Sequence, residues 1–366
     1  MAAPDLVVAA VAQVQEPAAS VLRSPEFWQR LLAAELAPAK NRVLLEELGS
    51  FASDPLSFLL ASSTLSDAEK KRMETVGLDP LKSALLEGVR VLEYDDYPEL
   101  LHESGNVSPA LFVKGDLECL YRPTVAIVGT RSASLYGKAC AYKFAQALAS
   151  AGVTVVSGGA LGIDAAAHKG ALEAGGKTAA VLATGTDTVY PRVHHGLFQQ
   201  ISDSGCLVSQ FAVGSRINDF KFLIRNILIA SLSSAVVVIE APAKSGALST
   251  ATAANELGRE VFVLPANIDL FGFQGSFSLL RDGATLVTHP DQILESLQIE
   301  PVAAIEPATA TSMGSLILSV LTSIPISTEK IVELTGLEPS EVLSELTDLE
   351  LEGRVIRGSG GYALRP

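Results

Sequence analysis

Cysteine is scarce in this sequence, and the few residues present have no spacing typical of a disulfide framework or a zinc site. Cys119, Cys140 and Cys206 are an odd number and form no C-x-x-C pair, so we expect buried free thiols in a reducing cytoplasm. His194 and His195 have no cysteine or carboxylate at ligand spacing, so we expect a surface pair and no metal. A secreted disulfide scaffold and a structural zinc protein are therefore excluded.

The chain also lacks the long apolar runs of a membrane protein. Its N-terminal sequence Met-Ala-Ala-Pro-Asp has no basic n-region of the kind that opens a secretory signal peptide. The longest uncharged apolar run, residues 227–239, is too short and too rich in serine to span a bilayer. We therefore expect a cytoplasmic chain with no membrane contact.

The net charge of the chain is negative, but that of its middle part is slightly positive. The net charge is −14 and the isoelectric point about 4.9. Residues 1–119 carry 10 basic and 19 acidic side chains, residues 291–366 carry 4 and 12, and residues 120–290 carry 13 and 10. This balance argues against a protein that coats DNA non-specifically, but it allows a focused basic groove between acidic flanks.

The 366 residues are enough for two or three domains. A proline- and alanine-rich tract at residues 297–312 predicts an extended linker. We divide the chain into a small helical domain over residues 1–89, an α/β domain over 90–296, this linker, and a C-terminal domain over 313–366. The single tryptophan, Trp28, is expected in the core of the first domain.

The C-terminal domain has the pattern of a winged helix. Helical stretches are predicted at residues 316–321, 328–335 and 338–353, and a Gly-Ser-Gly-Gly turn within residues 354–364 predicts a hairpin. A winged helix often contacts DNA through its third helix. Here that helix would repel phosphate, so we expect this domain to contact protein; its acidic residues are Glu341, Glu345, Asp348, Glu350 and Glu352.

An apolar, β-branched run at residues 125–128 ends in a glycine- and hydroxyl-rich loop that precedes a helical pattern. The loop reads Gly129-Thr130-Arg131-Ser132. Such a loop can present free backbone N–H groups at a helix N-terminus, and its arginine can bond one phosphate through two N–H groups. We therefore predict an anion site at this loop.

A second strand, residues 153–157, ends in Ser157-Gly158-Gly159 and leads into an alanine-rich helix. Loops that leave adjacent parallel strands share the crevice at the carboxyl ends of those strands. Both loops should therefore face one ligand. The first loop lacks the G-x-G-x-x-G sequence of NAD-binding folds, which favours an anionic ligand over a ribose diol.

Strand-like and helical stretches then alternate along the chain. The strand-like runs span residues 178–184, 207–211, 235–241 and 260–265, and residues 249–257 predict one of the intervening helices. This alternation predicts crossover connections and a mostly parallel sheet. The expected fold class is α/β, an extended Rossmann-like parallel sheet with a small helical domain before it and a winged helix after it.

Short motifs follow one another through the α/β region in a distinctive order. They are Gly129-Thr130-Arg131, Tyr136-Gly137, Ser157-Gly158, Gly162-Ile163-Asp164, Ala167-His168, Tyr190-Pro191, Arg225-Asn226, Glu240-Ala241, Ser245-Gly246-Ala247-Leu248, Thr250-Ala251 and Gly258-Arg259. One such motif is weak, but the ordered set resembles the DNA-processing protein A (DprA/Smf) family.

That resemblance implies a protein without catalytic activity, cofactor or metal. It implies binding of single-stranded DNA, homodimerisation, and loading of RecA recombinase on incoming DNA during natural transformation. It also implies a SAM-like N-terminal domain. The implied DNA- and phosphate-binding residues are Gly129, Thr130, Arg131, Ser132, Ser157, Gly158, Gly159, Arg225, Asn226, Lys244, Ser245 and Gly246.

Within this set we expect different roles. Arg131 would anchor a phosphate, the backbone of residues 157–159 would form a neutral cradle, and Lys244 with Ser245 would touch the same strand. Tyr136 or Phe222 would stack on a base or simply be packed. The dimer contact is placed within residues 262–277, where Phe271, Phe273 and Phe277 are equally typical of a core.

The chain departs from the family pattern at two basic positions. Leu161 stands where the family usually has a basic residue before Gly-Ile-Asp, and Ile227 stands where it usually has a second arginine after Arg-Asn. Each difference removes one candidate phosphate contact. We therefore expect fewer ionic contacts to nucleic acid than in typical members, or the use of other basic residues such as Lys221 or Lys244.

The alternative is a nucleotide-processing or nucleotide-sensing enzyme, because Rossmann-like proteins such as the LOG-type phosphoribohydrolases have similar loops. Those enzymes carry Pro-Gly-Gly-x-Gly-Thr-x-x-Glu in the late core, whereas this chain has a Glu-Ala-Pro-Ala-Lys-Ser-Gly sequence from residue 240. His168 follows Asp164 by one helical turn, so the two form either a catalytic pair or a structural one beneath the second loop. Binding is the favoured interpretation.

Overall fold

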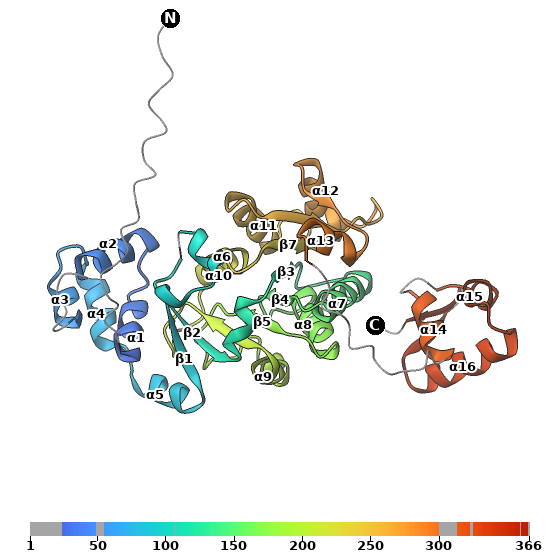
Figure 1. Ribbon diagram of the computed structural model, residues 1–366, viewed down its shortest axis with the longest axis horizontal. Helices are drawn as coiled ribbons and strands as arrows, with labels where there is room; N and C mark the ends of the chain where they lie inside the picture. The colour runs from blue at the N-terminus through green and yellow to red at the C-terminus, as the bar shows by residue number, and fades with distance from the viewer. Residues whose placement is uncertain are drawn as a thin grey trace, which may run out of the picture.

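A nine-stranded sheet forms the centre of the computed structural model, which describes residues 24–48, 55–105, 107–299, 313–322, 325–358 and 360–364 (Figure 1). The strand order is β1-β2-β6-β5-β4-β3-β7-β8-β9. The strands are β1 (Val89–Glu93), β2 (Ala110–Gly115), β3 (Thr124–Val128), β4 (Thr154–Ser157), β5 (Thr178–Val181), β6 (Cys206–Ser209), β7 (Ala235–Val238), β8 (Glu260–Val263) and β9 (Thr285–Leu286).

Pairing within this sheet is mostly parallel. From β6 across to β9 every neighbouring pair is parallel, whereas β1 pairs with β2, and β2 with β6, in antiparallel fashion. The α/β fold class is therefore confirmed. The antiparallel edge was not expected, because β1 and β2 precede the alternating pattern on which the sequence prediction depended.

Side chains alternate between the two faces of the sheet, and each face packs on helices. Val125 and Ile127 of β3 lie in one buried cluster with residues of α7 (Leu135–Ser150), α8 (Ile163–Glu173) and α13 (Pro290–Ser296). A further cluster adds α9 (His195–Ser204), which packs on Ala180 of β5.

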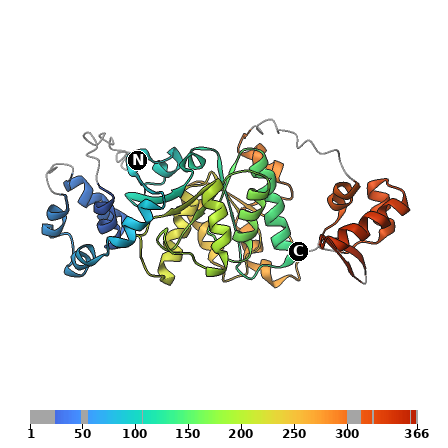
Figure 2. The same cartoon turned by 90° about the horizontal axis from the view of Figure 1, so that it is seen from below.

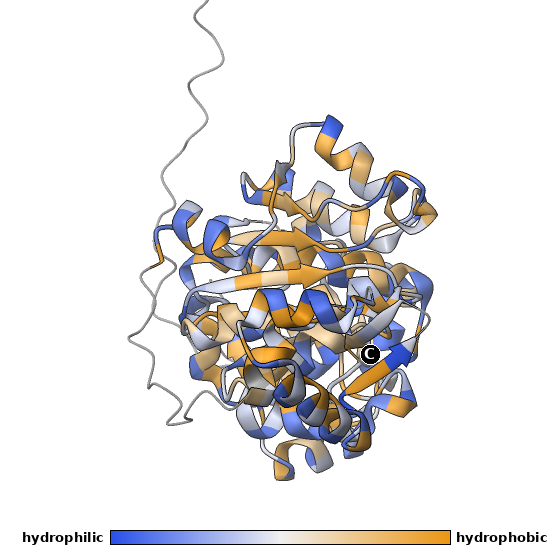
Figure 3. Ribbon diagram, turned by 90° about the vertical axis from the view of Figure 1, so that its right-hand side faces the viewer, coloured by the Kyte–Doolittle hydropathy of each residue, from blue (hydrophilic) through white to orange (hydrophobic). Residues whose placement is uncertain are grey.

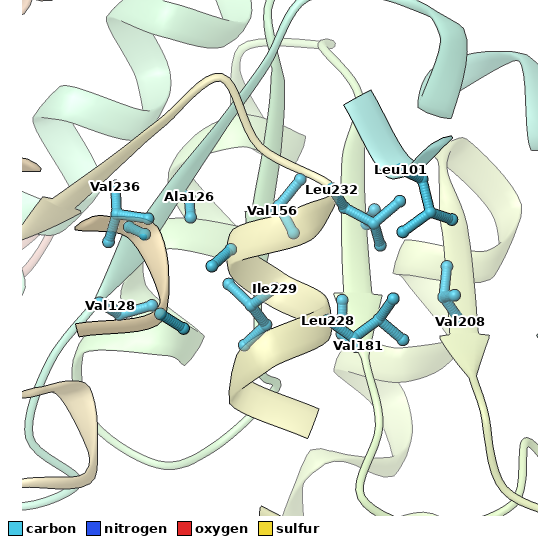
Figure 4. Close-up of a cluster of buried hydrophobic side chains, with 14 of the residues drawn as sticks. Leu101, Ala126, Val128, Val156, Val181, Val208, Leu228, Ile229, Leu232 and Val236 are labelled. Atoms are coloured by element: carbon cyan, nitrogen blue, oxygen red, sulfur yellow. The ribbon is translucent and has the colours of Figure 1, made fainter. Parts of the chain in front are cut away.

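The opposite face packs on α10 (Asp219–Ser231) and α11 (Gly246–Glu256). Figure 4 shows Leu228 and Ile229 of α10 and Leu232, the residue that caps this helix, lying against side chains of the strands, among them Val156 and Val181. Each of these three side chains is at most 2% exposed. Because each buried side chain of this size stabilises the fold by about 1.5–3 kcal/mol, α10 is firmly seated on the sheet.

Strand order reverses direction between β3 and β7. After β3 the chain crosses through α7 to β4 on one side, whereas β7 lies on the other side of β3 and is followed by β8. In open α/β sheets, ligands bind outside the carboxyl ends of the strands near such a switch point. The loops after β3, β4, β5 and β7 all leave the sheet at this edge.

In the described residues before the sheet, 24–48 and 55–88, five helices pack at one end of it (Figure 2). The first begins after an N-cap at Ser24, whose hydroxyl accepts a bond from the Phe27 amide, with Pro25 in the first helical position. Trp28 is 1% exposed within their core, as expected. The helices are α1 (Pro25–Ala33), α2 (Pro38–Leu48), α3 (Pro55–Ala61), α4 (Asp67–Thr75) and α5 (Asp79–Leu86).

The C-terminal elements agree with the predicted winged helix. Three helices, α14 (Met313–Val320), α15 (Thr328–Thr335) and α16 (Pro339–Leu351), are followed by an antiparallel pair, β10 (Val355–Gly358) and β11 (Gly361–Leu364). They bury a common core that includes Ile317, Leu346 and Tyr362. Viewed from this end, the helices carry alternating hydrophobic and hydrophilic bands (Figure 3).

We keep the division at 1–89, 90–296, 297–312 and 313–366 as a proposal. Its first boundary falls within β1, and residues 1–23, 49–54 and 300–312 lie outside the described part of the chain. Among the described residues, none of the helices combines the length and apolar character needed to cross a bilayer.

The three cysteines are free, and Cys119 and Cys206 are buried, whereas Cys140 is half-buried. The sulfur atoms of the two buried residues lie 3.3 Å apart. No local sequence pattern predicted this proximity, because the two residues lie 87 positions apart in the chain.

Candidate nucleic-acid interface

Several backbone amides of the loop after β3 donate to acceptors within the fold. The amide of Thr130 donates to the Glu240 carbonyl at 2.8 Å, and the amide of Ser132 donates to the Thr130 hydroxyl at 3.2 Å. The amide and hydroxyl of Ser134 both donate to the Glu240 carboxylate, at 2.9 and 2.7 Å. These three amides of the loop therefore have acceptors within the fold, and Glu240, which follows β7, supplies two of those acceptors without any signal in the local sequence pattern.

Glu240 occupies the switch point itself. Its side chain is 4% exposed and lies at the N-terminus of α7, where the helix dipole favours a negative charge. The space around it is tight, since a Cβ atom added to Gly137 or Gly272 would lie 2.2 or 2.5 Å from its carboxylate oxygens. The position that holds a pyrophosphate in dinucleotide-binding folds is thus filled by a carboxylate of the chain.

Arg131 differs from the rest of its loop because its side chain is exposed and keeps its charge unpaired. Its guanidinium carbon lies 4.7 Å from the centre of the Phe222 ring, within the range of a cation–π contact. None of the ion pairs between residues that the structure describes involves Arg131. An aromatic face orients this arginine without neutralising it, which leaves the guanidinium available to an anion.

Arg131 stands at the mouth of a pocket between the loops after β4 and β5 and the first turns of α10. Three predicted residues line it, Arg131, Gly158 and Arg225. The Tyr190 ring lies 5.8 Å from the Phe222 ring and adds a second aromatic wall. The complete lining is Arg131, Gly158, Ala160, Leu161, Leu182, Ala183, Thr184, Tyr190, Pro191, Phe222 and Arg225.

The loop after β4 uses its polar groups internally. The Ser157 hydroxyl is fully buried and donates to the Ile127 carbonyl at 2.7 Å. One carboxylate oxygen of Asp164 accepts the amides of Gly158 and Ala160, both at 3.2 Å. The Gly158 amide of the expected phosphate cradle and the neighbouring Ala160 amide therefore serve to fold the loop, and Gly159 is buried beside them. Burial raises the pKa of Asp164, opposed by the nearby Arg225 and by the loop amides.

Arg225 forms the floor of the pocket. It is 5% exposed, and one guanidinium nitrogen donates to the carbonyls of Gly158 and Val181. Its Nε donates to the Asn226 side chain at 3.1 Å. Burial lowers the pKa of this guanidinium, and Asp164 opposes that shift. Arg225 thus shapes the pocket and contributes positive potential to it.

Asn226, Ser245 and Gly246 join α10 to the start of α11. The Asn226 side-chain amide donates to the Gly246 carbonyl at 3.1 Å and to the Ser249 hydroxyl at 2.8 Å. The Ser245 hydroxyl accepts the Ala247 amide at 3.2 Å as an N-cap. Lys244 is exposed just before this cap. Of these residues, Lys244 is the charged one, and its side chain is exposed to solvent.

His168 is a structural residue beneath the second loop. The Thr178 hydroxyl donates its one proton to the Val155 carbonyl at 2.6 Å, so it accepts at 2.7 Å from Nδ1 of His168. The other ring nitrogen, Nε2, is buried with no hydrogen-bond partner among the described residues, so a second proton there would have no acceptor. Burial lowers the pKa of His168 to about 3, assisted by the positive fields of His194 and Arg225. This arrangement favours the structural interpretation of the pair Asp164 and His168.

The remaining candidates separate into packed and exposed positions. The Tyr136 hydroxyl donates to the Pro265 carbonyl at 3.2 Å, so of the two aromatic candidates it is Phe222 that lines the pocket. Leu161 and Ile227, at the two positions that depart from the family pattern, are 44% and 41% exposed. Apolar side chains thus stand at the surface where the pattern has charge.

Two family models match successive parts of the chain. The family model for DNA recombination-mediator protein A matches residues 89–298, and the model for the DprA winged helix domain matches residues 301–361. Protein Smf of Escherichia coli (strain K12) is 37% identical over 285 residues, which cover 73% of this chain and 74% of that protein.

Two solved structures are similar as well. The X-ray structure of DNA processing protein A from Streptococcus pneumoniae is 31% identical with a TM-score of 0.65, and the match covers 75% of this chain and 98% of that one. A structure of DNA processing protein A from Helicobacter pylori, described for its single-stranded DNA binding mode, is 31% identical with a TM-score of 0.53 over 57% and 95% of the two chains. The chain therefore belongs to the DNA recombination-mediator protein A family, which includes the proteins named Smf and DprA.

Proposed function

We propose that this chain is a single-stranded DNA-binding protein of recombination that holds a DNA strand across the carboxyl edge of its sheet. It protects incoming DNA and loads RecA recombinase in natural transformation. The Helicobacter pylori relative, described for its single-stranded DNA binding mode, supports the ligand class. The net positive charge of the middle of the chain supports the location, since residues 120–290 carry 13 basic and 10 acidic side chains.

The exposed and unpaired Arg131 is the observation that carries this proposal. It stands above a pocket whose walls are aromatic and whose floor is the buried Arg225. A strand whose phosphate is bonded by Arg131 would pass the Tyr190 ring, which lines the same pocket. Stacking on an aromatic ring tolerates every base. Lys244 provides a second charge after β7. Binding should therefore depend little on sequence.

The loop after β3 supports binding over nucleotide chemistry. In a nucleotide-binding Rossmann fold, the phosphates sit on the amides at the N-terminus of the first helix. Here Glu240 bonds the Ser134 amide at that position, and a pyrophosphate placed there would meet a buried carboxylate. We therefore propose that the chain acts without catalysis, cofactor or metal, and we rank the phosphoribohydrolase-like enzyme second.

Fluorescence anisotropy with labelled oligo-dT tests the proposal. The experiment compares oligo-dT with a duplex of equal length and with a mononucleotide competitor, each at two salt concentrations. We expect oligo-dT to bind best, with affinity that falls as salt rises. Preferential binding of the mononucleotide would favour the enzyme and overturn the proposal.

Dimerisation and the partner protein are further parts of this proposal. Within residues 262–277, Phe262 and Phe273 are each 1% exposed and belong to the core, whereas Phe271 is 86% and Ile268 is 81% exposed. We place the homodimer contact on these two exposed side chains. Light scattering at micromolar concentration should find a dimer, and a Phe271→Ser variant should shift it toward monomer. A wild-type monomer would sink this assignment.

A further inference from the structure

We infer that the N-terminal helices position the DNA pocket, and that Gln29 and Glu35 are the residues through which they do so. The inference rests on the proposed function, because it assigns a role within the same binding site. Its structural basis is the segment that runs from the end of β6 into the first turn of α10, residues 210–221, which we call the bridge segment. Both walls of the pocket are tied to this segment.

Gln29 of α1 holds the bridge segment at its centre. It is fully buried, its side-chain amide donates to the Val213 carbonyl at 2.7 Å, and its side-chain oxygen accepts the Val213 amide at 2.9 Å. Val213 and the neighbouring Ala212 also pack in an apolar cluster with Leu32 of α1. Gln29 therefore bonds both backbone groups of Val213, as a neighbouring strand would, and fixes Val213 against α1.

Glu35 holds the same segment at the beginning of α10. Its carboxylate pairs at 2.7 Å with Lys221, whose side chain is 5% exposed, and the Lys221 ammonium also donates to the Arg216 carbonyl at 3.0 Å. Glu35 adopts a positive φ of 53°, a conformation that is uncommon outside glycine. A strained backbone thus presents the carboxylate to the residue that precedes Phe222.

The bridge segment reaches both walls of the pocket. The Gly214 amide donates at 2.9 Å to Asp187, which lies in the loop that carries Tyr190 and Pro191. That loop packs closely here, since a Cβ atom on Gly185 would lie 2.9 Å from the Cα of Val213. On the other side, the Gln210 side chain donates to the Ile224 carbonyl of α10 at 3.2 Å.

A continuous set of contacts therefore runs from α1 through Val213 and Lys221 to the two aromatic walls. If the N-terminal helices shift, the bridge segment loses the contacts with Gln29 and Glu35 that fix it. It then no longer holds the Tyr190 and Phe222 rings at a centroid distance of 5.8 Å. Thermodynamic linkage then requires the reverse effect as well. A strand that binds between these walls must strengthen the attachment of α1 to the bridge segment.

The principal variant is Glu35→Ala, because Glu35 is half-exposed and its loss leaves the core packed. The matched control is Glu69→Ala, which removes the same charge from the same helical region and breaks an ion pair of 2.6 Å with Lys40 that does not touch the bridge segment. Simple electrostatics predicts that either loss of negative charge tightens DNA binding. Coupling predicts the opposite for Glu35 alone.

We expect Glu35→Ala to weaken oligo-dT binding about fivefold, a coupling at the lower end of those between linked sites, with the salt slope of wild type. The slope is preserved because no phosphate contact is lost. Gln29→Met, of similar volume, should behave alike, Glu35→Gln should lie between, and Glu69→Ala should bind as wild type or slightly tighter. Equal affinities for wild type and the folded Glu35 and Gln29 variants would overturn the inference.

Hydrogen exchange tests the coupling directly, because helices that only stabilised the fold would not change their amide exchange when DNA binds. In wild type, oligo-dT should slow amide exchange in residues 25–35 as well as in the bridge segment, and Glu35→Ala should reduce this protection of α1. Protection confined to the pocket would overturn the inference. A wild-type chain that fails to bind oligo-dT at all would instead overturn the proposed function, so the two failures are distinguishable.

Discussion

The loops that follow β3 and β4 leave neighbouring strands at the same edge of the sheet, yet they use their polar groups differently. The loop after β3 bonds its amides to Glu240 and Thr130 and leaves the Arg131 side chain exposed. The loop after β4 buries Ser157, Asp164 and the floor residue Arg225 beneath it. The first loop offers a charge to a ligand, and the second fixes the shape that receives it.

This difference suggests where a substitution changes binding and where it changes folding. An exposed arginine at the end of a strand contributes little to the core, so its loss should affect the ligand. A buried arginine that bonds two carbonyls is part of the fold, so its loss leaves unsatisfied groups in the interior. The predictions below test this division in order of expected size.

Arg225→Met should destabilise the fold by about 3 kcal/mol, because two buried carbonyls lose their donor and Asp164 loses its neighbouring positive charge. Urea denaturation followed by circular dichroism measures the change. Arg131→Met is the matched control, for which we expect less than about 0.5 kcal/mol. Equal stabilities for the two variants would contradict the division between the loops.

Lowering the pH should destabilise the second loop through His168. Its folded pKa of about 3 lies below the ordinary value of 6.5 for histidine, so below pH 6.5 the unfolded chain takes up a proton that the folded chain does not bind. Relative to His168→Gln, wild type should lose about 1.4 kcal/mol of stability per pH unit as the pH falls from 6.5 toward 3. Parallel curves for the two proteins would show that this imidazole is not held neutral.

Phe222→Leu tests how the first loop holds its arginine. The substitution removes the ring beneath Arg131 but keeps an apolar side chain, and a cation–π contact of this kind contributes about 0.5–1 kcal/mol. We expect oligo-dT affinity to fall severalfold while the salt slope stays that of wild type, since the guanidinium remains. A reduced slope would mean that the ring controls the charge itself.

Removal of the winged helix should have the smallest effect. A chain of residues 1–299 loses acidic side chains of α16 and carries less negative charge, so its affinity for oligo-dT should be unchanged or slightly higher. Anisotropy against the full chain measures this. A large loss of affinity in the folded truncation would mean that the winged helix binds DNA, contrary to its charge.

Local pattern predicted much of this molecule. Alternating strands and helices predicted the parallel sheet, and the apolar spacing after residue 313 predicted the winged helix, because both depend on neighbours in sequence. The loop around Arg131 was located in the same way. The same loop pattern predicted an anion site with Arg131 as its phosphate anchor, and the exposed position of Arg131 in the structure supports that prediction.

Long-range contacts could not be predicted in this way. The carboxylate that fills the end of α7 comes from Glu240, 106 residues beyond Ser134. Gln29 meets Val213 across 184 residues. The antiparallel strands β1 and β2 join the sheet beside β6, which no local periodicity indicates. The sequence therefore predicted which residues border the pocket more readily than which ones hold it in place.

The salt dependence of oligo-dT binding by Arg131→Ala tests the central claim most directly. If Arg131 anchors one phosphate, the folded variant should bind about tenfold more weakly, and the slope of log affinity against log salt should fall by somewhat under one unit relative to wild type. Circular dichroism and urea denaturation establish that the variant is folded. Wild-type affinity and wild-type slope in that folded protein would contradict the assignment of Arg131 as the phosphate anchor.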